Sequence, residues 1–213
     1  MAFMARENTI QKLYQELKTK HGRPGEQWQL WCKRPKTSAE REEVLIGAIL
    51  TQRANWRNVE LAIMNLKKAG FLSLRKISQV SGRDRNKMAA LIRPSGFYKQ
   101  KAGYLLGLAK FVIENYGNLK KMSSEPLLKL RQELLNQKGV GPETADSILL
   151  YALDKPVFVI DEYTRRLAIK KCLSGDLSYA PLQAFFEQTL RKDFRLYQDF
   201  HALIVIEGKW SRM

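Results

Sequence analysis

The stretch Leu134-Leu135-Asn136-Gln137-Lys138-Gly139-Val140-Gly141-Pro142-Glu143-Thr144-Ala145-Asp146 decides how this chain folds. Two glycines flank one apolar residue between an apolar helical run and a second helix. Glycine is common just after the last turn of a helix, and proline suits the first turn of the next. Such a turn can also expose backbone N–H groups at a helix N-terminus, where a phosphate can bind. The segment therefore predicts a helical hairpin whose turn is either a simple connection or a phosphate site.

Outward from this segment, helical periodicity dominates the chain. Apolar residues recur at three- and four-residue spacing, as along one face of an amphipathic helix. The only β-like run, Pro156–Ile160, is too short and isolated to build a sheet. The sequence predicts an all-α fold in which Gly22–Lys36 is a polar connection after the first helix. The predicted helices are Ile10–Leu17, Glu43–Leu50, Val59–Leu66, Tyr104–Val112, Leu127–Leu135, Ala145–Ala152, Thr164–Lys171, Pro181–Lys192 and Arg195–Glu207.

The charge of the chain points to a polyanionic partner. It has 37 lysines and arginines against 21 acids, a formal net charge of +16. That excess favours DNA, RNA or an anionic membrane, and the alternative is a surface that serves solubility alone. The basic residues form only short clusters, such as Lys99-Gln100-Lys101, so a folded surface rather than a tail carries them.

Composition also excludes several classes of protein. No apolar run reaches the ~20 residues that a membrane span needs, and Met1–Glu7 lacks the long apolar region of a secretory signal. We therefore expect a cytoplasmic, non-secreted protein without a membrane partner. The two cysteines, Cys32 and Cys172, are too few for a Cys₄ zinc site or an iron–sulfur cluster, and free thiols are expected.

A single acid, Asp161, ends the apolar run Val157–Ile160 downstream of the hairpin. An aspartate just before a helix is usually an N-cap, and the helix dipole keeps its carboxylate ionised. In a groove, an ionised acid can stabilise a cationic transition state or activate water. Asp161 is therefore a candidate for helix capping, for catalysis, or for both.

Together these segments resemble the endonuclease III superfamily of DNA glycosylases. Leu134–Asp146 looks like the helix-hairpin-helix of that family, and Ala152–Asp161 looks like its Gly/Pro-Asp loop. Upstream, Ile46–Gln52 is similar to an early helix with its Gln-bearing loop. Arg93–Ala102 is similar to a Gly-(Phe/Leu)-Tyr-x-x-Lys-Ala turn, and the segments follow one another in the family's order.

The resemblance implies a helix-hairpin-helix DNA glycosylase fold, with two helical subdomains and the active-site cleft between them. Residues 1–40 and 156–213 would form one subdomain. Residues 41–155 would form the helical bundle that carries the hairpin at 134–146.

Two departures from the family narrow this expectation. Members that cleave the strand carry a lysine two residues after the second hairpin glycine, and here that position is Glu143. A glutamate cannot form the Schiff base that β-elimination requires. The family's iron–sulfur cluster needs four closely spaced C-terminal cysteines, which this chain lacks. The resemblance thus implies a monofunctional member without the cluster.

The type III 3-methyladenine DNA glycosylases share the glutamate and the Arg-Pro-Ser-Gly-Phe-Tyr segment. That branch lines its base pocket with aromatic residues, which implies a role for Trp56 and for Trp28 or Trp31. Lys209 would correspond to a lysine near the pocket. The alternatives are that the tryptophans belong to the core and that Lys209 is a solvated surface residue.

The same resemblance assigns the residues that face DNA. Gln52 would fill the vacated base stack, and the hairpin would hold a phosphate through Lys138, Gly139, Val140, Gly141 and Thr144. The family also binds a monovalent cation at the hairpin, here through the backbone carbonyls of Leu135, Gln137 and Val140. No other cofactor is expected.

The expected function is base excision repair by a monomeric, nucleoid-associated enzyme acting on double-stranded DNA that contains a damaged base. Asp161 would stabilise the oxocarbenium sugar as the base leaves. Glu143 would contact the flipped nucleotide or position Asp161, unless it is a solvated acid. Two alternatives stay open: a glycosylase for oxidised or mismatched bases, and a helix-hairpin-helix protein that binds DNA without catalysis.

Overall fold

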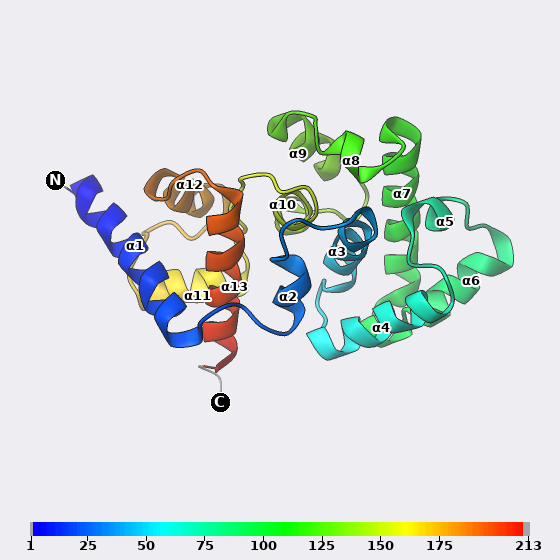
Figure 1. Ribbon diagram of the computed structural model, residues 1–213, viewed down its shortest axis with the longest axis horizontal. Coiled ribbons are helices and arrows are strands. Elements are labelled where there is room, and N and C mark those ends of the chain that lie inside the picture. Colours follow the sequence, from blue (N-terminus) through cyan, green and yellow to red (C-terminus); the bar gives the residue numbers. More distant parts are fainter. Residues whose placement is uncertain (1, 211–213) are drawn as a thin grey trace. The chain divides into compact units, whose positions relative to one another are not determined.

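The chain is helical in the part that the structure describes, namely the backbone of residues 2–210 and the side chains of residues 9–210 (Figure 1). This computed structural model has no strand in that range, so the all-α prediction is confirmed. The helices, with one 3₁₀ segment (η1) and one π segment (η2), are α1 (Ala2–His21), α2 (Gln27–Trp31), α3 (Ser38–Leu50), α4 (Trp56–Lys68), α5 (Leu74–Ser78), α6 (Gly82–Leu91), η1 (Arg93–Ser95), α7 (Tyr98–Tyr116), α8 (Leu119–Met122), α9 (Leu127–Leu135), α10 (Pro142–Ser147), η2 (Ile148–Ala152), α11 (Glu162–Lys170), α12 (Tyr179–Thr189) and α13 (Phe194–Trp210).

Two predictions about local structure are wrong. Gly22–Lys36 is not only a polar connection, because α2 forms within it and buries Trp28 and Trp31. A five-residue helix is too short to show periodicity and depends on tertiary packing for its stability. The helix expected at Ala145–Ala152 is not uniform either, since α10 ends at Ser147 and wider π turns follow it.

The chain divides into two compact units. The terminal unit combines the residues up to Lys33 with those from Asp154 onward, and the central unit runs from Arg34 to Leu153. The family resemblance placed these boundaries at 40/41 and 155/156. The hairpin lies in the central unit, whereas Asp161 lies in the terminal unit.

The terminal unit is built around α13, which packs against α1 and α11. Its core is aromatic: Phe158 stacks on Phe186 with ring centroids 4.5 Å apart, and Phe200 meets both rings edge-on. Offset-stacked and edge-to-face rings gain about 0.5–1.5 kcal/mol beyond the area that they bury. The extended segment before Asp161 is thereby fixed to the middle of α13.

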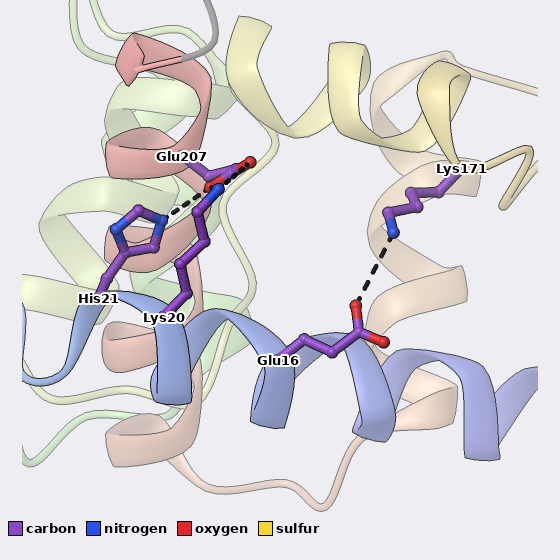
Figure 2. A network of polar contacts seen from close by, with 5 residues as sticks. All are labelled: Glu16, Lys20, His21, Lys171 and Glu207. Carbon is purple, nitrogen blue, oxygen red and sulfur yellow. Dashed lines mark hydrogen bonds and ion pairs between the residues drawn. The ribbon is translucent and has the colours of Figure 1, made fainter.

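Ion pairs join the C-terminal half of α1 to Glu207 on α13 and to Lys171, which follows α11 (Figure 2). Glu207 on α13 accepts from Lys20 at 2.8 Å and contacts the His21 ring nitrogen at 2.7 Å, while Lys171 lies 3.8 Å from Glu16. The hydrogen bond from Lys20, helped by that of His21, lowers the pKa of Glu207 despite its partial burial. The two lysines of this network are largely exposed, and exposed ion pairs contribute about 0–1 kcal/mol. The buried side chains of Ile10, Leu13 and Leu17 therefore do most to hold α1 in place.

The central unit is organised around α3, whose residues from Val44 to Leu50 are all buried. Its N-terminus is fixed by a capping box between Thr37 and Glu40. η2, also wholly buried, packs on α3, while α5 and α6 pack on α7. No helix in the described part of the chain is long and apolar enough to cross a membrane.

Candidate functional site

The predicted hairpin is formed by α9 and α10. Its turn is closed by backbone hydrogen bonds of 3.0 Å from Gln137 N–H to the Leu134 carbonyl and from Val140 N–H to the Gln137 carbonyl. Arg131 on α9 donates to both carboxylate oxygens of the buried Asp146 on α10, at 2.7 and 3.1 Å. A bidentate guanidinium–carboxylate pair fixes orientation as well as distance. The two helices of the hairpin are therefore held in one arrangement.

The two hairpin glycines are required for different reasons. Gly139 has φ +84°, and a Cβ built on it would stand 2.3–2.4 Å from the Tyr104 ring. Gly141 has φ −90°, a conformation open to any residue, and a Cβ on it would meet no atom within 4 Å. Packing inside the protein thus dictates Gly139, whereas the space beside Gly141 is open to an external group.

The turn also offers hydrogen-bond donors. The N–H groups of Gly139 and Gly141 donate to no other group in the part of the chain that the structure describes, and no side chain caps α10. Lys138, which directly precedes Gly139, is exposed and adds a positive charge. This arrangement matches the chemistry of a phosphate oxygen, which accepts backbone N–H groups at a helix N-terminus.

Gln52 is tied to the same turn. Its amide nitrogen donates to the Gly139 carbonyl at 2.8 Å and to the Thr144 hydroxyl at 3.0 Å. The structure therefore brings together three of the residues that the resemblance assigns to DNA contact. In this conformation the Gln52 amide faces the hairpin.

The three carbonyls expected to bind a cation can be tested against this geometry. The carbonyls of Leu135 and Val140 accept no hydrogen bond from any residue in the described range, and that of Gln137 accepts only the Val140 N–H. Carbonyl oxygens of this kind can replace the hydration shell of a monovalent cation. These three carbonyl oxygens thus fit the monovalent cation that the resemblance implies.

A buried lysine holds two loops of the central unit in place. Lys101, only 2% exposed, donates to the Leu50 carbonyl at 2.8 Å and to the Ser95 carbonyl at 2.7 Å. Burial lowers its pKa to about 8. Leu50 leads into the Gln52 loop, and Ser95 leads into Phe97. The Lys101 ammonium group therefore links the loop that carries Gln52 to the turn that carries Phe97.

Phe97 is unusual in both conformation and exposure. It has φ +47°, in the left-handed region that costs an L residue about 1–2 kcal/mol, and its side chain is 60% exposed. A large apolar side chain held in a strained backbone and offered to solvent suggests function rather than packing. Phe97 is therefore added to the residues that are candidates for DNA contact.

Asp161 caps α11 as the sequence predicts. Its Oδ1 accepts from the Thr164 N–H at 2.7 Å and the Thr164 hydroxyl at 2.9 Å. Its Oδ2 lies 3.5 Å from Nε2 of His201, and the side chain of Asp161 is 14% exposed. Burial by itself would raise the pKa of Asp161, but the charge and hydrogen bond of His201 and the two Thr164 donors outweigh it and hold that pKa below 3.8. Asp161 is therefore a carboxylate at neutral pH.

The tryptophans of α2 extend this cluster. The Trp28 ring meets two rings edge-on: that of His201, with centroids 5.9 Å apart, and that of Trp31, with centroids 5.8 Å apart. Both tryptophans are buried. Within the terminal unit, Trp28 thus connects the Asp161–His201 pair to Trp31 in a buried aromatic cluster. Lys209, also on α13, is half-buried and lies eight residues past His201, about 12 Å along the helix axis.

The other candidates lie in the central unit. Trp56 begins α4 and is half-buried, behind an N-cap in which Asn55 accepts from the Asn58 N–H. Glu143 lies in the first turn of α10 and is exposed.

Sequence reasoning missed His201, Lys101 and Phe97. His201 is one of only two histidines, yet nothing in its spacing connects it to an aspartate forty residues earlier. In the sequence alone, nothing distinguishes Lys101 from the many lysines expected on the surface. The sequence shows the Gly-Phe-Tyr segment as a motif, but only the structure shows that Phe97 is exposed and strained.

Comparison with known proteins places this geometry in a family. Residues 46–192, which include both the hairpin and Asp161, match the family described as HhH-GPD superfamily base excision DNA repair protein. The chain belongs to the HhH-GPD superfamily.

Relatives of known sequence agree with that assignment. This HhH-GPD chain is 48% identical over 168 residues to the "Putative DNA repair glycosylase MJ1434" of Methanocaldococcus jannaschii, covering 78% of this chain and 75% of that protein. It is 31% identical over 125 residues to the endonuclease III of Thermotoga maritima, covering 59% of this chain and 54% of that enzyme.

A solved structure extends the match to nearly the whole chain. The crystal structure of H. pylori 3-methyladenine DNA glycosylase (MagIII) bound to 1,N6-ethenoadenine superposes with a TM-score of 0.79. It is 31% identical in sequence, and the alignment covers 96% of this HhH-GPD chain and 98% of the other. An endonuclease III–DNA complex at 18% identity and a TM-score of 0.73, covering 96% of this chain and 86% of that one, agrees in fold.

Proposed function

We propose that this HhH-GPD protein is a monomeric DNA glycosylase of base excision repair that hydrolyses the N-glycosidic bond of an alkylated purine. The observation that carries the proposal is Asp161, a carboxylate held in one orientation by Thr164 and His201 in a nearly buried site. Capping α11 needs only the one oxygen that Thr164 occupies. A second, charged oxygen would repel phosphate, so DNA binding alone does not account for the carboxylate.

The lowered pKa of Asp161 indicates which chemistry it performs. A carboxylate that is hard to protonate is a weak base, so its main effect is to stabilise the positive charge that develops on the sugar as the C–N bond breaks. Thr164 occupies Oδ1, which leaves Oδ2 to face the reacting sugar and to orient the attacking water. The ion pair with His201 favours the charged form of this carboxylate.

The hairpin supports DNA as the substrate. The free N–H groups of Gly139 and Gly141 would hold a backbone phosphate, with Lys138 adding charge. When bound, a monovalent cation at the carbonyls of Leu135, Gln137 and Val140 would supply positive charge beside that phosphate. Solved relatives with the same fold are complexes with DNA by their titles.

The target nucleotide must leave the helix, because its glycosidic bond is out of reach within a base stack. Gln52 and the exposed Phe97 are the side chains that would enter or wedge the stack. For Gln52 this requires release of its bonds to Gly139 and Thr144. Unstacking costs a few kcal/mol and less for a damaged base, which favours damaged sites.

An alkylated purine suits the remaining residues. A base that carries a positive charge is a good leaving group and needs little protonation, which fits a site with one carboxylate. It would also gain cation–π attraction from an aromatic side chain, for which Trp56 and either Trp28 or Trp31 are the candidates. The 31% identical MagIII, a 3-methyladenine glycosylase by its title, supports this class. Lys209, on the same helix as His201, is a further candidate for contact with the base.

Glu143 supports base release without strand cleavage. Since a carboxylate cannot form a Schiff base with the sugar, borohydride should trap no covalent enzyme–DNA adduct. Efficient trapping would show that an amine of this chain attacks the sugar, and it would refute this part of the proposal.

One assay tests the function as a whole. Duplexes carrying single lesions, namely N3-methyladenine, ethenoadenine, an oxidised pyrimidine, 8-oxoguanine or a G·T mismatch, are incubated with the protein and heated in alkali. We expect cleavage at the alkylated purines alone. Cleavage at the oxidised or mismatched bases instead would favour the endonuclease III-like alternative. Tight binding without any cleavage would favour a non-catalytic DNA-binding protein.

A further inference from the structure

The segment from Ser73 to Lys101 carries more charge than the hairpin that the proposed function uses. It contains eight lysines and arginines and a single acid, Asp84. Five of these cations project from two helices and are exposed: Arg75 and Lys76 on α5, and Arg83, Arg85 and Lys87 on α6. They are called the basic surface below.

These cations are not neutralised by the protein. Within the described residues, none of the five forms an ion pair or a side-chain hydrogen bond, and Lys87 has only the Phe71 ring, at 5.8 Å. Arg83 and Lys87 are also four residues apart on one helix, a like-charge spacing that costs a helix a few tenths of a kcal/mol. A surface needed only for solubility would gain from acids at such positions.

The five side chains belong to one region of the central unit. Helices α5 and α6 both pack on α7 (Figure 1). The ammonium groups of Lys76 and Lys87 reach the same turn: the first lies 3.3 Å from where a Cβ on Gly70 would stand, and the second lies over the neighbouring Phe71.

The basic surface is next to the turn that presents Phe97. A terminal nitrogen of Arg85 lies 3.6 Å from where a Cβ on Gly103 of α7 would stand. Gly103 follows Phe97 by six residues, about 9 Å along the helix axis. Phosphates follow each other about every 3.4 Å of axis along each DNA strand, so a duplex in contact with Phe97 has phosphates within reach of α6.

We propose that the basic surface binds the phosphate backbone of the duplex that flanks the damaged nucleotide. The inference rests on the proposed function only for the position of the damaged nucleotide, near Gln52 and Phe97. Duplex DNA is favoured over a membrane because the described segment from Ser73 to Leu91 exposes no large apolar side chain that could enter a bilayer.

The test compares two triple variants of the central unit. Arg83→Gln/Arg85→Gln/Lys87→Gln neutralises the basic surface. Lys110→Gln/Lys120→Gln/Lys121→Gln removes the same charge from exposed sites on the far half of α7 and on α8. Thermal unfolding first establishes that both variants fold. The affinity for an undamaged 30-base-pair duplex is then measured by fluorescence anisotropy over a range of salt concentrations.

We expect the basic-surface variant to lose up to about 2.7 units of the slope of log K against log[salt], since each phosphate contact contributes about 0.9. At 0.15 M salt that corresponds to a loss on the order of 100-fold in affinity. The control variant should keep the wild-type slope. Equal losses in both variants would overturn the proposal, because they would show a general charge effect.

A second measurement locates the contact. A duplex with a stable abasic analogue at a fixed position is shortened from one end and then from the other. Shortening one arm should weaken binding by wild-type protein and by the control variant, but not by the basic-surface variant. Equal sensitivity of all three proteins, or tighter binding to duplex RNA of the same length, would overturn the proposal. Because the slopes use undamaged DNA, a failure of the proposed base release would be seen separately.

Discussion

The two hairpin glycines allow a sharp test of what the protein and its ligand each require. Gly139→Ala forces an L residue to φ +84°, at a cost of about 1–2 kcal/mol. It also places a methyl group 2.3–2.4 Å from the Tyr104 ring, and overpacking of this kind costs about 1–3 kcal/mol. The expected loss is therefore about 2–5 kcal/mol, out of a total stability of about 5–15 kcal/mol.

Gly141→Ala should behave in the opposite way. Its φ of −90° suits alanine and its Cβ position is open, so the unfolding free energy should change by less than about 1 kcal/mol. The added methyl group would occupy the space in which a phosphate meets the hairpin N–H groups. Loss of one charge-assisted hydrogen bond, worth about 1.5–3 kcal/mol, predicts about 10- to 150-fold weaker DNA binding.

Thermal unfolding and fluorescence anisotropy measure both quantities. For a chain of this length each kcal/mol shifts Tm by about 2–4 °C, so Gly139→Ala should lower it by about 4–20 °C. In a Tyr104→Ala background the same substitution should cost about 1–3 kcal/mol less, since the clash is gone. The reasoning is refuted if Gly139→Ala leaves Tm unchanged, or if Gly141→Ala binds DNA as tightly as the wild type.

Three further predictions concern titratable groups. Asp161→Asn should abolish base release but keep DNA binding, because Asn retains the oxygen that accepts from Thr164 and caps α11 but lacks the charge. Alkaline cleavage measures base release, and anisotropy measures DNA binding. His201→Gln should raise the pKa of Asp161, since burial is then less opposed, and so move the acid limb of the pH–rate profile to higher pH. Lys101→Met should remove a pH dependence of stability: the pKa of Lys101 is about 8 when folded against 10.5 when unfolded, so the unfolding free energy of the wild type relative to the variant should rise by about 1.4 kcal/mol per pH unit across that interval.

Each of these has a clear contrary result. Full activity of Asp161→Asn would remove Asp161 from the mechanism. An unchanged acid limb in His201→Gln would mean that Thr164 alone keeps the carboxylate ionised. A constant stability difference between wild type and Lys101→Met in urea titrations from pH 8 to 10.5 would show that the ammonium is not buried in solution.

The stability of the wild type should also respond to acid through Asp161. Its pKa is lower in the folded chain than the ordinary value of 3.8. The carboxylate therefore contributes stability above that value, and the contribution is lost as the pH falls through the folded pKa. The difference in unfolding free energy between wild type and Asp161→Asn should shrink in this window, which chemical denaturation at pH 2–5 can measure.

Local interactions explain what the sequence determined by itself. The all-α class, the long helices and the Asp161 cap depend on contacts between residues three or four positions apart, which periodicity and capping residues reveal directly. The hairpin follows from Gly139, Gly141 and Pro142 in the same way. The short helix α2 was not predicted, because five residues carry too little local information.

Only the tertiary structure decided the state of the groups that would do chemistry. His201 fixes the charge of Asp161 from forty residues away, Tyr104 makes Gly139 obligatory from thirty-five, and Lys101 reaches the Leu50 carbonyl from fifty-one. Burial and pKa depend on which distant side chains pack together, and that is a property of the assembled core rather than of any window of sequence. The sequence therefore specified where the helices and the hairpin lie, while packing decided which carboxylate is charged, which lysine is buried and which aromatic side chain is exposed.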